Sequence, residues 1–126
     1  MLKTFAMTAV LMLGCAASLL GQDVAVVNPN TIRVKLDNTQ VRVLEATIKP
    51  GVKEKPHSHP ASIVYVLSGG RMRTHLPDGT TSDATYTAGQ TVYRDPVTHW
   101  AENIGKTTVH LIVVELKQQQ GSGTTQ

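Results

Sequence analysis

Short segments of alternating polarity make up most of this chain, and their spacing constrains the fold more than any other feature. Residues 32–36 alternate apolar with charged side chains, residues 41–48 form a second run, and Pro50 and Gly51 end it. Such alternation is typical of a strand with one buried face. Beyond the first 21 residues no extended window carries a helical period, so the sequence predicts an all-β domain.

Later segments repeat this spacing. We expect further strands at residues 63–67, 71–76, 80–87, 91–94 and 107–116. Gly69–Gly70 and Pro77–Gly79 supply two of the turns between them. The last segment is apolar at nearly every position, so it is expected to be covered on both faces. Regularly spaced short strands predict a sandwich or a barrel.

Residues 1–21 have the pattern of an export signal. Lys3 gives a positive start, Phe5–Leu13 is an apolar core too short to span a membrane, and small residues then offer cleavage sites. Cys15, the only cysteine, can form no intrachain disulfide. Its position after Leu-Gly resembles a bacterial lipoprotein signal, which leaves lipid anchoring as an alternative. We expect an exported protein, periplasmic or secreted, with no transmembrane span.

The remaining residues suffice for one domain with a modest core. Residues 22–30 are interpreted as a connector, residues 31–117 as the barrel, and residues 118–126 as a polar, disordered tail. Without Lys3 the chain carries 11 basic and 9 acidic residues, scattered along it, so nucleic-acid binding is not expected. Lysines 49, 53 and 55 fit a solvated loop, although they would also attract an anionic ligand.

Two histidines, His57 and His59, stand two residues apart. On an extended backbone both side chains point to one face, where both imidazoles can converge on a metal ion. Imidazole suits iron, nickel, copper and zinc. The pair alone is a weak signal for a metal site, but other residues follow and precede it at spacings that strengthen the signal. They are Gly51 six residues before His57, the apolar run 63–67, Gly69 and Gly70, and later Gly89, Pro96, His99 and Asn103.

This order resembles the two motifs of the cupin superfamily. The first motif is matched by Gly51, His57, His59 and Gly70 (or Gly69). The second is matched by Gly89, His99 and Asn103, with the gap before His99 one residue short and Pro96 displaced toward that histidine. The resemblance covers roughly residues 31–117. It implies a double-stranded β-helix, or jelly-roll barrel, and a divalent transition metal bound by His57, His59 and His99.

One residue of the family pattern, the metal-binding glutamate of the first motif, is missing. Its position falls at Ile63 when counted forward from His59, and at Ser62 when counted back from residues 65–67. With three neutral histidines as the only protein ligands, the site is expected to prefer iron, zinc or copper over manganese. The alternative is that the histidines line a barrel mouth without binding metal.

Other side chains near the motifs have weaker roles. Tyr65 shares the parity of His57 and His59, so it is expected either to donate a hydrogen bond inside the barrel, as a candidate catalytic residue, or to lie in the core. Trp100 is expected to face away from His99. We expect His75 to be outside and solvated, His110 to be a hydrogen-bonded residue at the core edge, and Glu102 and Asn103 to cap a turn.

The function implied by the resemblance is that of a metal-dependent enzyme. Three-histidine sites in this superfamily often belong to oxygen-using enzymes, which implies a dioxygenase-like oxidoreductase acting on a small organic molecule. The alternatives are a small-molecule binding or sensing module without turnover, and a purely structural barrel. Cupins commonly form homodimers by pairing sheet edges, so a homodimer is a further expectation.

Overall fold

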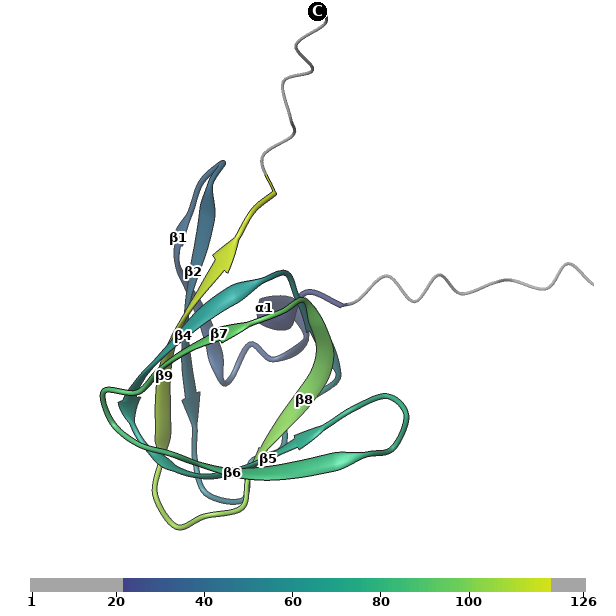
Figure 1. The fold of residues 1–126 in the computed structure, drawn as a ribbon, viewed down its shortest axis with the longest axis vertical. Helices are drawn as coiled ribbons and strands as arrows, with labels where there is room; N and C mark the ends of the chain where they lie inside the picture. Colours follow the sequence, from purple (N-terminus) through teal and green to yellow (C-terminus); the bar gives the residue numbers. More distant parts are fainter. Residues whose placement is uncertain (1–21, 119–126) are drawn as a thin grey trace, which may run out of the picture.

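Nine strands form two antiparallel sheets in the computed structural model, which describes residues 22–118 (Figure 1). The first sheet has the order β1 (Ile32–Asp37), β2 (Val41–Ile48), β9 (Val109–Leu116), β4 (Ser62–Ser68) and β7 (Thr91–Arg94). The second has the order β3 (His57–His59), β8 (Val97–Asn103), β5 (Gly70–His75) and β6 (Thr81–Tyr86). The all-β, cupin-like barrel expected from the sequence is confirmed.

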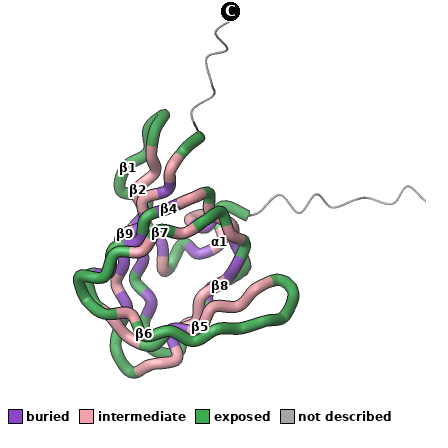
Figure 2. The backbone as a smooth tube through the Cα atoms, viewed as in Figure 1, coloured by how far each residue is buried: buried purple, intermediate pink, exposed green. Residues whose placement is uncertain are grey.

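Apolar side chains from the central strands of the first sheet fill the barrel. Alternate residues of β2 and β4 are buried, as the period of two requires. Figure 2 marks the buried positions along these strands in purple. The core consists of Val24, Ile32, Leu44, Ala46, Ile48, Val64, Val66, Met72, Val109, Leu111 and Val113.

Strand β9 differs from its prediction. Leu111 and Val113 are buried, but Ile112 and Val114 on the opposite face are only partly covered. The expectation that this strand is covered on both faces is therefore wrong, because within residues 22–118 nothing packs over the outer side of the first sheet. Its outward apolar residues remain at the surface.

The crossing from the first sheet to the second is made at Gly69, between β4 and β5. A Cβ atom at this position would lie 1.9 Å from the backbone oxygen of Tyr86, which no side chain tolerates. The carbonyl of Gly69 also accepts a hydrogen bond from the Thr107 hydroxyl at 2.8 Å. Glycine is needed here for close backbone approach rather than for an unusual dihedral angle.

The segment interpreted as a connector contains a short helix, α1 (Val24–Val27). The Asp23 carboxylate accepts hydrogen bonds from the backbone amides of Ala25 and Val26, which caps the helix start. Val24 is 1% exposed and belongs to the core. The segment thus completes the barrel as well as leading into it. No helix within residues 22–118 is long and apolar enough to cross a membrane.

The predicted export signal, with its alternative lipid-anchoring site at Cys15, and nearly all of the predicted disordered tail lie outside the described residues.

Candidate metal centre

Pairing of β3 with β8 brings the three motif histidines together. His57 and His59 lie two residues apart on β3, and the antiparallel register places His99 of β8 directly opposite His57. Cross-strand partners share a face of the sheet, so all three side chains point into the barrel. Their intervening neighbours Ser58 and Thr98 point outward and hydrogen-bond each other at 2.6 Å.

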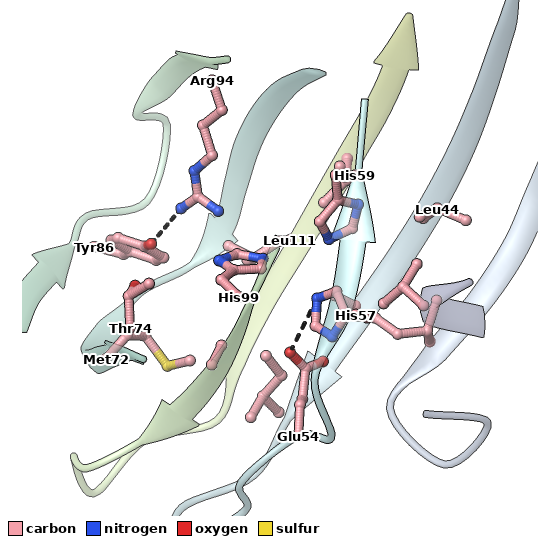
Figure 3. A pocket seen from close by; sticks show the side chains of 16 residues that line it. Leu44, Glu54, His57, His59, Met72, Thr74, Tyr86, Arg94, His99 and Leu111 are labelled. Carbon is pink, nitrogen blue, oxygen red and sulfur yellow. Dashed lines mark hydrogen bonds and ion pairs between the residues drawn. The ribbon is translucent and has the colours of Figure 1, made fainter. Parts of the chain in front are cut away.

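The three imidazoles converge on one point (Figure 3). One ring nitrogen from each residue lies within 4.8 Å of the others, and the ring centroids are 4.8 to 5.4 Å apart. Nitrogens that share one zinc ion at about 2.1 Å can lie at most about 4.2 Å apart. The arrangement therefore needs only a small ring adjustment to match the spacing around one ion.

The other ring nitrogens of two histidines are held by oxygen acceptors. The Nδ1 atom of His57 lies 2.8 Å from the carbonyl oxygen of Lys55, and the Nδ1 atom of His59 lies 2.6 Å from the Glu115 carboxylate. When Nδ1 donates to such an oxygen, Nε2 is left deprotonated and free to bind a metal. Metal-binding histidines almost always have a partner of this kind.

Two of the three histidines are neutral at physiological pH. Burial lowers the pKa of His57 to about 4, and burial together with the nearby His57 and His59 lowers the pKa of His99 to about 3. The ordinary value is 6.5. Neutral imidazole is the form that binds metal, so these residues need not lose a proton first.

Two buried carboxylates near the histidines were missed by the sequence analysis. Glu54 has one oxygen 4.0 Å from Nε2 of His57, and Glu115 bonds His59 as described. Burial raises the pKa of Glu54, a shift partly offset by a hydrogen bond from Thr31. The site is thus not free of acidic groups. Glu54 lies among lysines in the sequence, and Glu115 lies near the end of an apolar strand, so neither residue stood out as a candidate for the site.

The family's glutamate position is occupied by Ser62. Ser62 is 2% exposed and faces inward on β4, whereas Ile63 is 38% exposed and faces outward. The count back from residues 65–67 therefore gives the matching position. Tyr65 is 43% exposed on the outer face, so the prediction that it lies inside the barrel or in the core is wrong. The chain leaves β3 at His59 and begins β4 at Ser62, which breaks the parity assumed between His59 and Tyr65.

The other two histidines lie away from the cluster. His110 bonds Glu45 at 2.9 Å, as expected for a histidine at the core edge. His75 is on the outer face as predicted, but it is not freely solvated. Its ring bonds Glu102 at 2.7 Å and stacks on Trp100 at a centroid distance of 5.5 Å.

The two polar residues at the end of the second motif have different roles. Asn103 donates hydrogen bonds to the carbonyls of Ile48 and Thr107 and accepts one from the Gly105 amide, which fixes the turn as predicted. Glu102 was expected to cap the same turn. It bonds His75 instead.

The histidines line an inner space that shares part of its wall with an open groove. Glu54 and the three histidines line an inner space of about 40 Å³, large enough for an ion and a few waters. An adjoining open groove of about 410 Å³ runs beside His99. Both spaces are lined by Thr74, Tyr86, Arg94 and His99. A small molecule in the groove would therefore contact His99, one of the three histidines.

The donor set fits a transition metal. His57 and His99 are neutral, and His57 and His59 are held by oxygen acceptors. Three convergent nitrogens of this kind form a site that leaves coordination positions open for a substrate or water. Such all-nitrogen protein ligands suit iron, copper and zinc.

Comparison with known proteins supports the same fold. A family model of the cupin domain matches residues 44–115. A cupin domain from Bordetella pertussis is 26% identical, with a TM-score of 0.64 over 69% of this chain and 92% of that one. An RmlC-like cupin family protein with a double-stranded β-helix fold from Methanocaldococcus jannaschii is 18% identical, with a TM-score of 0.57 over 68% of this chain and 78% of that one.

A third solved structure has the same architecture. It is an uncharacterised conserved protein with a double-stranded β-helix domain from Klebsiella pneumoniae, 23% identical, with a TM-score of 0.57 over 73% of this chain and 82% of that one. No curated protein matches the chain. The histidines of both motifs meet on adjacent strands of a two-sheet barrel, and the family model spans most of that barrel; the chain belongs to the cupin family.

Proposed function

We propose that this protein binds one divalent transition metal through His57, His59 and His99 and uses it to transform a small organic molecule. The observation that carries this proposal is the convergence of the three imidazoles on an inner cavity that shares part of its wall with an open groove. Iron, zinc or copper is preferred over manganese, because the histidine ligands supply only nitrogen.

The surrounding residues support chemistry at this point. When bound, the metal would polarise a substrate oxygen or activate water or dioxygen. Glu115 orients His59, and the Lys55 carbonyl orients His57, so that each Nε2 atom faces the cavity. Glu54 is buried 4.0 Å from His57 and has a raised pKa, which suits a carboxyl group that accepts or donates a proton during turnover.

A second candidate function is a binding or sensing module without turnover. The observation that favours it is the serine at the family's glutamate position, since Ser62 contributes no carboxylate to the metal. The same groove would then hold a small molecule that is released unchanged.

Metal content tests the proposed site. The purified protein is expected to carry close to one transition metal ion per chain, and His57→Ala or His99→Ala to lose it, because two nitrogens bind far more weakly than three. His110→Ala is a matched control, since His110 bonds Glu45 away from the cluster. Full metal occupancy in His99→Ala would show that the metal is bound elsewhere.

Turnover separates the two candidate functions. The metal-loaded enzyme should consume oxygen or convert a small hydroxylated, thiol or keto compound, and His59→Ala should abolish this. A compound that raises the melting temperature and is recovered unchanged would support the binding module. If neither the compounds tested nor the three histidine substitutions change the melting temperature, the protein is a purely structural barrel.

Export and self-association complete the proposal. The pattern of residues 1–21 supports an exported protein, with lipid anchoring at Cys15 as the alternative. Mass spectrometry of the protein from the cell envelope and the medium would distinguish a cleaved chain from a lipidated one. A homodimer is supported by the uncovered apolar residues on the outer face of the first sheet.

A further inference from the structure

Arg94 is a cation in the cavity wall without an acidic partner. Of the five arginines in the described part of the chain, Arg42, Arg71 and Arg73 form ion pairs with carboxylates, and Arg33 is an exposed residue of β1 without one. No carboxylate within residues 22–118 lies within ion-pair distance of Arg94, although Asp95 lines the same groove and Glu54 lines the inner space that Arg94 also borders. Its guanidinium donates one hydrogen bond to the Tyr86 hydroxyl and extends toward the histidine cluster (Figure 3). Most of its donors are left unused.

The register of the sheet explains why Arg94 is unpaired. Arg94 of β7 lies directly opposite Ser62 of β4, and both side chains face inward. Ser62 is the residue at the family's glutamate position. A glutamate at position 62 would have placed a carboxylate beside the guanidinium. The other cross-strand neighbour of Ser62 is Glu115, which is already bonded to His59 and lies 3.7 Å from Arg42. Neither β4, which lies beside β7, nor β9, the next strand of the sheet, therefore supplies an acid to Arg94.

The cavities place this unpaired cation beside the candidate metal position. Arg94, Tyr86 and His99 line both the inner space and the open groove. The groove, at about 410 Å³, is within the size range of small-molecule sites. A molecule in the groove would therefore lie beside both the guanidinium and His99.

We propose that the ligand of this site is a small carboxylic acid, whose carboxylate pairs with Arg94 while a neighbouring oxygen, nitrogen or sulfur atom faces the three histidines. This inference rests on the proposed function and names its substrate class. The planar guanidinium fork matches a carboxylate with two parallel hydrogen bonds. The ligand then supplies the negative charge that Ser62 does not, both to Arg94 and to the ion.

Lactate and its uncharged analogue lactamide are suitable probes, because they differ only in the carboxylate. Calorimetric titration of the zinc-loaded protein should show that lactate binds about 10- to 100-fold more tightly than lactamide. In Arg94→Gln, lactate affinity should fall to that of lactamide, while lactamide affinity and zinc content stay unchanged. Arg94→Lys should lie between, since lysine keeps the charge and loses the fork. Arg33→Gln, a surface arginine of the same charge, is the matched control.

Equal affinity for the two probes, no binding of either, or an unchanged preference in Arg94→Gln would overturn the inference. The proposed metal site is judged separately, by zinc content. A protein that binds no zinc yet prefers lactate through Arg94 would contradict the metal proposal and keep this one. A protein that binds zinc but has equal affinity for lactate and lactamide would support the metal proposal and contradict this one.

Discussion

The surroundings of each histidine distinguish the candidate metal ligands from the other histidines of the described chain. His75 and His110 each bond a carboxylate and remain partly exposed. His57 and His99 are nearly inaccessible, and their pKa values are lowered by burial. Burying several imidazoles together lowers the stability of the fold. Such a cluster is typical of a functional site that binds a ligand.

The buried histidines should make the metal-free protein sensitive to acid. Their pKa values of about 4 and about 3 lie below the ordinary 6.5. Below about pH 6.5 the unfolded chain therefore binds protons that the folded chain excludes. The free energy of unfolding should fall by about 1.4 kcal/mol per pH unit for each histidine between roughly pH 6 and pH 4. Glu54 opposes this loss, because its raised pKa favours a protonated folded state.

Urea unfolding of the metal-free protein at pH 7, 6 and 5 measures this effect. The midpoint should decrease steadily as the pH falls. His57→Gln and His99→Gln should each flatten the dependence, whereas His110→Gln should keep it. Unfolding midpoints that are the same at pH 7 and pH 5 would show that the two histidines are not buried in the neutral form.

At the level of strands, sequence patterns predicted the positions of the strands well and the contacts between their side chains less well. Alternation located β2 to within a residue, because each strand buries one face of its own. Tyr65 was misplaced because parity cannot be carried across the turn between β3 and β4. Glu54 and Glu115 could not be assigned, because their histidine contacts depend on how the chain packs in three dimensions. Arg94 likewise acquires its significance only from its register with Ser62.

Because Ser62 and Ile63 of β4 face opposite sides of the sheet, they allow a direct test of the role of the family's missing glutamate. Ser62→Glu should raise manganese affinity relative to zinc, because it adds a hard oxygen ligand facing the histidines. Ile63→Glu is the matched control, since residue 63 faces outward and a glutamate there cannot reach the site. Competitive metal binding measures both variants. An identical metal preference in the two folded variants would show that position 62 does not face the ion.

At the scale of the whole molecule, the outer face of the first sheet carries a continuous apolar row. The strand registers align it across all five strands, in the order Leu36, Val43, Val114, Ile63 and Tyr93. Leu36, Ile63 and Tyr93 are 48%, 38% and 61% exposed. Exposed apolar patches of this kind mark interaction surfaces. In a homodimer related by a two-fold axis, the same row would pack against its copy.

The dimer should therefore form through this face and not at a sheet edge. Sedimentation velocity is expected to show a dimer for the native protein and a monomer for Ile63→Asp and Tyr93→Asp, because each would bury a charge within the apolar row. Thr85→Asp adds the same charge to an exposed position of the second sheet, so it should remain dimeric. Metal content should be equal in all four proteins, since the row faces away from the histidines. A native protein that sediments as a monomer, or a dimer unaffected by both substitutions, would rule out this face as the dimer interface.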